Sequence, residues 1–95
     1  MIMKLPQNYT KLDAKERRLV REAYVQIQNG NCCHCKASLS GEPSASVRHK
    51  TINYTLFPPN FFKYPVHLHH SHKTGMTIGA VHNRCNAYLW QYKGE

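Results

Sequence analysis

The chain has 95 residues, a length that fits one small domain. Lys and Arg total 13 whereas Asp and Glu total 5, so the formal charge is +8 and a polyanionic partner is the first expectation. No apolar run approaches the ~18 residues of a membrane-spanning helix, which excludes such a span, and no secretory signal pattern opens the sequence.

A chain of this size buries only about two-thirds of its unfolded surface, so we expect a marginal core that needs a metal, disulfides or a partner. Four Cys and seven His in a chain without a secretory signal favour metal over disulfides. No acidic residue lies between positions 43 and 94. Any metal in the second half must therefore be held by His, Cys, Asn or backbone groups, which excludes a two-metal site built from carboxylates.

The N-terminal region predicts an arm over 1–12, packed at Leu5 or Tyr9, followed by a helical segment over 13–30. Asp13 and Glu16 have the spacing of a capping box. Apolar residues recur every four positions, which predicts one buried stripe flanked by Val20 and Tyr24; the stripe is Leu19, Ala23 and Ile27. The opposite face holds Lys15, Arg18, Arg21 and Glu22, and Asn29-Gly30 ends the helix.

Residues 31–40 form a cysteine-containing turn, and residues 41–65 form an irregular segment rich in Ser and Pro. The composition of 41–65 predicts turns and short extended pieces. The segment also carries five aromatics, which argue against disorder: Tyr54, Phe57, Phe61, Phe62 and Tyr64. We expect them to cover the core, with a base-stacking role as the alternative.

The last third of the chain predicts a hairpin followed by a helix. Residues 66–69 alternate as a half-buried strand does, 73–75 make a turn, and 77–81 form the returning strand. Asn83 is the expected cap of a helix that runs to Tyr92. The fold class is therefore small α+β, in a single domain without internal repeats.

Two pairs of metal-binding residues share the same spacing. Cys32-x-x-Cys35 follows the first helix, and His82-x-x-Cys85 opens the last one. Together they supply four soft or borderline donors, enough to close a tetrahedral zinc site and pin the two ends of the irregular segment together. The alternative is that these residues are small core residues near an unrelated His. We expect Cys33 to be packed or free.

Four histidines lie within six residues on the hairpin: His67, His69, His70 and His72. On a strand, His67 and His69 share one face whereas His70 points to the other. One imidazole can therefore ligate a metal while its neighbour remains a base that titrates near neutral pH. A solvated His-rich loop is the alternative.

The order Leu68-His-His-Ser-His72, Lys73-Thr-Gly75 and Ile78-Gly-Ala-Val-His-Asn-Arg-Cys-Asn86 resembles the HNH endonucleases, in particular the branch similar to the phage recombination endonuclease VII. The resemblance covers 24–40 and 66–92. It implies a zinc-stabilised ββα-metal (His-Me finger) motif over 66–92, which the N-terminal helix and the zinc knuckle at 31–40 precede. The whole of 1–95 would then be one nuclease domain.

The resemblance also implies roles for individual residues. His70 falls on the general base, His69 and Asn86 on the ligands of one catalytic cation, and His72 on a supporting position. The structural zinc ligands would be Cys32, Cys35, His82 and Cys85. His69 stands where the family usually has Asp, which favours Mn²⁺, Co²⁺ or Ni²⁺ over Mg²⁺.

The expected function is metal-dependent hydrolysis of DNA phosphodiester bonds, by nicking or double-strand cleavage. Candidate phosphate contacts are Arg18, Arg21, Lys73 and Arg84, of which Arg84 could replace the family Arg missing at Ile78. The expected partner is DNA, with a homodimer left open, in the cytoplasm of a bacterial or phage-infected cell. The alternatives are a non-catalytic zinc-stabilised nucleic-acid-binding module and a zinc domain for protein interaction.

Overall fold

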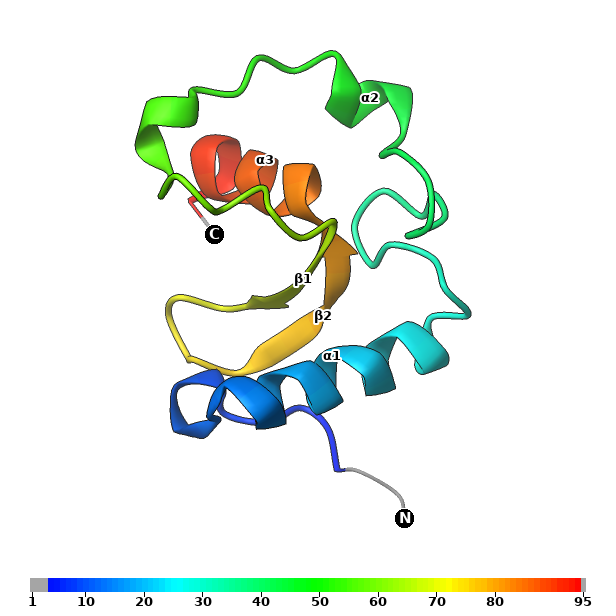
Figure 1. Cartoon of the computed structure of the whole chain (residues 1–95), viewed down its shortest axis with the longest axis vertical. Helices are drawn as coiled ribbons and strands as arrows, with labels where there is room; N and C mark the ends of the chain where they lie inside the picture. Colours follow the sequence, from blue (N-terminus) through cyan, green and yellow to red (C-terminus); the bar gives the residue numbers. More distant parts are fainter. Residues whose placement is uncertain (1–3, 95) are drawn as a thin grey trace.

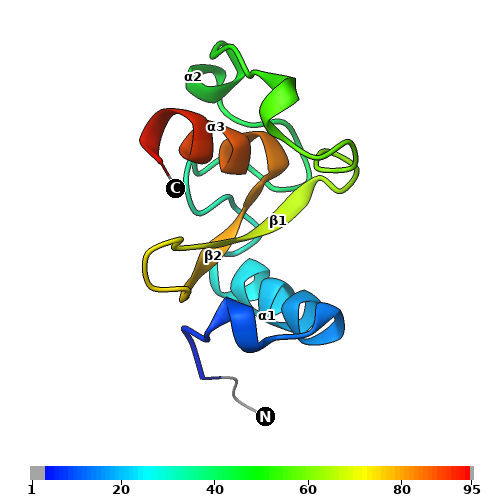
Figure 2. The same ribbon diagram turned by 90° about the vertical axis from the view of Figure 1, so that its left-hand side faces the viewer.

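The computed structural model describes residues 4–94 and shows a two-stranded hairpin between two helices (Figure 1). The main elements are α1 (Ala14–Ile27), β1 (Val66–His70), β2 (Thr77–His82) and α3 (Asn83–Lys93). In Figures 1 and 2, α1 lies on one side of the hairpin and α3 on the other. The predicted α+β class and order of elements are confirmed. Within residues 4–94, no helix is long and apolar enough to cross a membrane.

Helix α1 begins and ends as its sequence predicts, within slightly narrower bounds. The Asp13 carboxylate accepts a hydrogen bond from the Glu16 backbone at 2.8 Å, and the Glu16 carboxylate accepts one from the Asp13 backbone at 3.0 Å. At the other end, Asn29 and Gly30 both take left-handed conformations, with φ of 56° and 75°. The Gly30 N–H then donates to the carbonyl of Val25 at 2.9 Å, which closes the helix.

The buried face of α1 is not the predicted stripe. Val20 and Tyr24 are 1% and 9% exposed, whereas Leu19 and Ile27 are 43% and 66% exposed. Val20 and Tyr24, which were expected to flank the buried stripe, therefore form the centre of the buried face. The physical reason is the Tyr24 hydroxyl, which hydrogen-bonds the Thr77 side chain at 2.9 Å and draws this face of the helix onto β2.

The hairpin is antiparallel, pairs Val66 with His82, and contains an irregularity between His69 and His70. The outer edge of β2 is covered rather than exposed. The Gln28 amide bonds both the N–H and the carbonyl of Ala80, each at 2.9 Å. The Cys33 backbone donates to the same carbonyl at 2.9 Å, so a glutamine side chain and a loop take the place of a third strand here.

The N-terminal arm packs where it was expected to pack. Leu5 and Tyr9 are partly buried against the core, and the Tyr9 N–H donates to the carbonyl of Gly75 at 2.8 Å. The arm contains a short helical turn, η1 (Tyr9–Lys11). It therefore braces the hairpin turn from outside.

Helix α3 starts directly from β2, and its predicted cap is wrong. Asn83 is the first helical residue, and the preceding His82 makes no side-chain cap. The Asn83 amide instead donates to the carbonyls of Phe62 and Tyr64, at 3.3 and 2.9 Å. With no loop between strand and helix, the amide is placed to anchor the irregular segment instead.

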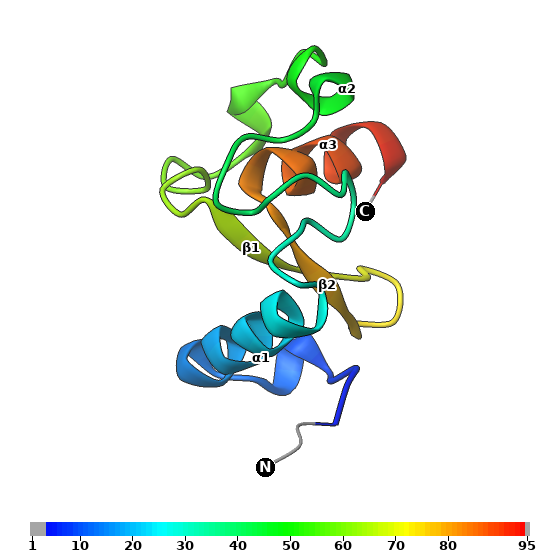
Figure 3. The same ribbon diagram turned by 90° about the vertical axis from the view of Figure 1, so that its right-hand side faces the viewer.

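Residues 41–65 contain two short helical pieces, α2 (Ala45–Arg48) and η2 (Tyr54–Leu56), where turns and extended pieces were expected. Figure 3 shows α2 on the far side of α3 from the hairpin. Arg84 of α3 fastens this segment, because its guanidinium donates to the carbonyls of Arg48 and Lys50 at 3.2 and 2.8 Å.

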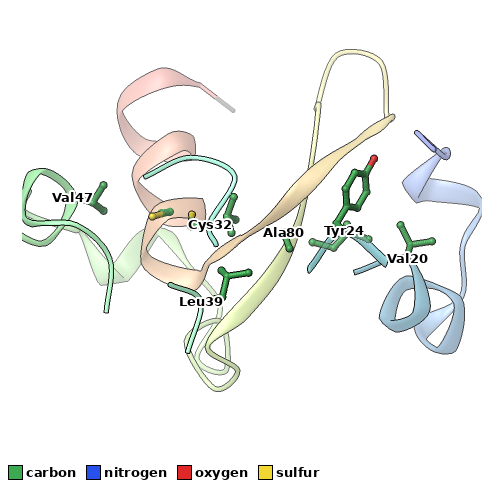
Figure 4. Packing of buried hydrophobic residues seen from close by; sticks show 9 residues of the cluster. Val20, Tyr24, Cys32, Leu39, Val47 and Ala80 are labelled. Carbon is green, nitrogen blue, oxygen red and sulfur yellow. The ribbon is translucent and has the colours of Figure 1, made fainter. Parts of the chain in front are cut away.

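The hydrophobic core joins every main element across the hairpin (Figure 4). It consists of Val20, Tyr24, Cys32, Leu39, Val47, Leu68, Ala80, Val81 and Cys85. The prediction that the five aromatics of the irregular segment cover this core is wrong, because none of them belongs to it. Phe57 instead contacts Phe61, Phe62 and Trp90, in an aromatic cluster of its own.

Gly79→Ala tests the close packing at the edge of β2. A Cβ at Gly79 would lie 2.8 Å from the Gln28 Oε1 and 2.9 Å from the Cys33 Cβ and Sγ. We expect the substitution to lower the free energy of unfolding by about 1–3 kcal/mol, as overpacked cores do.

The matched control is Gly41→Ala, whose Cβ would meet only the Ser38 carbonyl at 3.8 Å. Denaturant unfolding of the zinc-loaded proteins measures both effects. Equal stability of the two variants would show that the edge of β2 is not tightly packed.

Candidate functional site

The structure brings the four predicted zinc donors together. The ligand atoms of Cys32, Cys35, His82 and Cys85 all lie within 4.8 Å of one another. The His82 Nδ1 is 3.4 Å from the Cys35 Sγ and 3.6 Å from the Cys85 Sγ. A tetrahedral zinc with its usual bond lengths separates a sulfur and a nitrogen ligand by about 3.5 Å. The cluster could therefore hold a structural zinc ion.

Groups around the cluster orient its ligands. The His82 Nε2 lies 2.8 Å from the Ser38 carbonyl, so this nitrogen carries the proton and Nδ1 is the metal-facing atom. The His34 N–H points at the Cys32 Sγ from 3.4 Å, and Lys36 adopts a left-handed φ of 70° that closes the cysteine turn. Such outer contacts are typical of a built metal site.

One thiol of the cluster is poised to ionise. A hydrogen bond from Cys85 lowers the pKa of the Cys32 thiol to about 3, and the same contact raises the pKa of Cys85. Because zinc requires thiolates, ion binding would release the protons that remain.

Cys33 is outside the cluster, as predicted. Its side chain is partly buried against the core, and its Sγ packs beside Gly79. The residue serves the edge of β2 through its backbone, and it offers a matched control for the zinc ligands.

A second feature is a groove of about 640 Å³ between α1 and the irregular segment, with the hairpin and α3 as its floor. Three arginines of α1 line one side: Arg17, Arg18 and Arg21. The floor includes His67, His70, His72 and Asn86, and no carboxylate of residues 4–94 lines the groove. A groove that combines cations and imidazoles in this way suits a polyanion.

His70 is held in the groove by stacking. Its ring lies parallel to that of Tyr9, with centroids 3.8 Å apart, and His72 meets it edge-on at 5.0 Å. Burial of the ring, together with the positive charges of His72 and Arg17, holds the pKa of His70 below its ordinary value. A neutral imidazole is the form that accepts a proton.

Asn86 has a partner that the sequence did not identify. Its Nδ2 lies 3.1 Å from the Nδ1 of His67, so the amide donates and its oxygen is directed elsewhere. Burial lowers the pKa of His67 below its ordinary value. The backbone of Phe61 and of Tyr64 acts in the opposite direction, because hydrogen bonds to it favour the protonated ring. Strand alternation places His67 on the same face as His69, but only the structure shows that it contacts Asn86.

His69 is 4% exposed and does not line the groove. Strand alternation places it on the same face of β1 as His67, and the His67–Asn86 contact shows that α3 covers this face. His69 and Asn86 thus lie on the same side of the hairpin, but His69 is buried whereas Asn86 lines the groove.

The four predicted phosphate contacts separate into three groups. Arg18 and Arg21 line the groove, and in residues 4–94 neither forms an ion pair. Lys73 is exposed in the hairpin turn, outside the groove lining. The predicted phosphate contact of Arg84 is wrong. Its guanidinium is bonded to two backbone carbonyls and to the Tyr54 hydroxyl at 3.1 Å, so Arg84 is a structural residue.

Comparison of this chain with protein-family models, with curated proteins and with solved structures gives no match.

Cys85→Ser tests the metal centre. We expect wild-type protein to carry one zinc per chain, and Cys85→Ser to weaken zinc binding by well over tenfold and to lower the melting temperature, because the core is short of apolar area. Native mass spectrometry counts the metal, and calorimetry reports the melting temperature.

Cys33→Ser is the control and should keep its zinc. Loss of zinc from Cys33→Ser, or a zinc affinity of Cys85→Ser equal to that of wild type in competition with a chelator, would mean that the ligands are assigned wrongly.

Proposed function

We propose that the protein is a metal-dependent DNA endonuclease that hydrolyses phosphodiester bonds in its groove. The observation that supports this most is the joint presence of His70 and Asn86 in one groove, which three arginines flank and which no carboxylate of residues 4–94 lines. The resemblance of 66–92 to HNH endonucleases implies the role of general base for His70 and of cation ligand for Asn86.

The arginines of α1 would bind the backbone of the substrate. Arg18 and Arg21 line the groove and are not held by ion pairs, whereas Arg17 is fixed by bonds to the Tyr9 carbonyl at 3.2 and 3.3 Å. Phosphate contacts of this kind carry no sequence information. We therefore expect weak sequence preference and strong salt dependence.

His70 would act as the general base. Stacking on Tyr9 fixes the plane of its ring, and its place in the groove lets it reach a water molecule beside a bound phosphate. In the hydrolysis, water adds to phosphorus as its proton passes to His70, the bond to the 3′-oxygen breaks, and that oxygen takes a proton from solvent. The products are a 5′-phosphate and a 3′-hydroxyl.

Asn86 and His69 would hold one divalent cation, which when bound supplies charge neutralisation at the phosphate and at the leaving oxygen. The donor set is one amide oxygen and one imidazole, without a carboxylate, and such a set favours Mn²⁺, Co²⁺ or Ni²⁺ over Mg²⁺. His67 would orient Asn86, because its Nδ1 accepts the amide N–H and turns the oxygen away.

His70→Ala tests the reaction. The variant should lose about 10²–10⁴ in the rate at which supercoiled plasmid is nicked, because it lacks the base, while its DNA affinity stays within twofold. The assay uses zinc-loaded protein freed of weakly bound ions, with Mg²⁺, Mn²⁺, Co²⁺ and Ni²⁺ added separately.

The matched control is His49→Ala, an exposed histidine outside the groove, which should cut as wild type does. Equal cleavage by His70→Ala and wild type would refute the role of His70. DNA binding without cleavage by wild type in any of the metals would favour the non-catalytic nucleic-acid-binding module.

Arg18→Gln/Arg21→Gln tests the groove as the binding surface. Removal of two phosphate contacts should weaken DNA binding at least tenfold in low salt and reduce the slope of log K against log salt by about 2. Fluorescence anisotropy of a labelled duplex measures both quantities.

Lys15→Gln, on the same helix and outside the groove lining, is the control and should change the slope little. Equal effects per charge at Lys15 and at the two arginines would mean that DNA binding follows net charge rather than the groove.

A further inference from the structure

One wall of the groove is aromatic, and the proposed phosphodiester hydrolysis does not use it. Leu56, Phe57, Phe61 and Tyr64 line the groove from the irregular segment, and Trp90 lines it from α3. Trp90 is 42% exposed and Tyr64 is 61% exposed, so large apolar surface faces solvent. In Figure 2, residues 57–64 and helix α1 lie above and below the start of β1.

The aromatic side chains of this wall pack against one another. The ring of Phe57 meets Trp90 edge-on at 5.6 Å and packs on Phe61 at 4.7 Å. Phe61 in turn contacts the ring of His67 edge-on at 4.7 Å. The aromatic cluster therefore continues into the floor of the groove at the residue that binds Asn86.

The chemistry of the two walls defines what fits between them. The arginine wall attracts phosphate, and the aromatic wall offers π faces to a flat apolar group. A nucleotide carries both groups on one unit. The groove volume of about 640 Å³ falls within the range of sites that enclose a small ligand. An acidic peptide would match the arginines and leave the aromatic wall without a partner.

A base can reach this wall only when it is outside a duplex. In double-stranded DNA the bases are paired and stacked inside, and stacking on protein aromatics requires an unpaired or flipped nucleotide. We propose that Phe57, Phe61 and Trp90 form a subsite for an unpaired nucleobase beside the bound phosphate, so that the protein prefers nucleic acid with single-stranded character. The position of the subsite beside the scissile phosphate rests on the proposed function; binding of the base does not.

Trp90 is the only tryptophan of the chain, so its fluorescence reports the subsite directly. Full-length zinc-loaded protein is titrated, with no other divalent cation, with a single-stranded oligonucleotide, with its duplex, and with an abasic strand of equal phosphate content. We expect strong quenching by the single strand and little by the duplex or the abasic strand. Equal quenching by the single and abasic strands would overturn the proposal.

Variants separate stacking from folding. Trp90→Ala should weaken binding of the labelled single strand about tenfold, within the usual range for one stacked base, and leave duplex affinity within twofold. Trp90→Phe should recover most of the single-strand affinity that Trp90→Ala loses, because phenylalanine keeps an aromatic ring for stacking. The control is Ile27→Ala, an exposed apolar residue at the end of α1 outside the groove lining, which should bind as wild type does.

The failure of this proposal differs from the failure of the proposed function. Metal-dependent nicking by wild type would support the proposed function. If Trp90→Ala then keeps its full single-strand affinity, only the proposal of a nucleobase subsite is refuted. Protein that binds neither single strand nor duplex would remove both.

Discussion

The structure depends on the point where the cysteine turn meets the junction of β2 and α3. Cys32 and Cys85 belong both to the hydrophobic core and to the four-donor cluster, so this cluster and the core overlap. A core of nine mostly small side chains buries too little apolar surface to hold a chain of 95 residues firmly. A zinc ion bound by the cluster would supply the missing free energy at the place where the loop, the strand and the helix converge.

The groove takes its geometry from this junction. Asn86 follows the ligand Cys85 directly, so a fixed cluster also fixes the start of α3 against the hairpin. Arg84, one position earlier, ties the irregular segment to the same helix, and Asn83 ties its end. Asn83, Arg84 and Asn86, which flank Cys85 of the four-donor cluster, thus set the floor of the groove and the attachment of its aromatic wall.

The parts of the fold governed by local chemistry could be predicted from the sequence. The Asp13–Glu16 capping box, the left-handed pair Asn29–Gly30 and the two Cys/His pairs all depend on spacing alone. The buried face of α1 could not be predicted from apolar periodicity, because the hydrogen bond of Tyr24 to Thr77 decides it, across 53 residues of sequence. The predicted role of Arg84 was wrong for a similar reason. The sequence identifies a cation, but it does not show that backbone carbonyls already bind this cation.

The proposed function requires two distinct metal sites, a Cys₃His cluster that is structural and a second site on the hairpin side of α3 that holds a labile cation. Anomalous diffraction from crystals of the zinc-loaded protein soaked in Mn²⁺ and a non-hydrolysable DNA tests this most directly. The account predicts a zinc peak among Cys32, Cys35, His82 and Cys85, and a manganese peak in direct coordination with the Asn86 Oδ1 and a ring nitrogen of His69. Manganese confined to the zinc cluster, or absent from Asn86 with DNA in the groove, would contradict it.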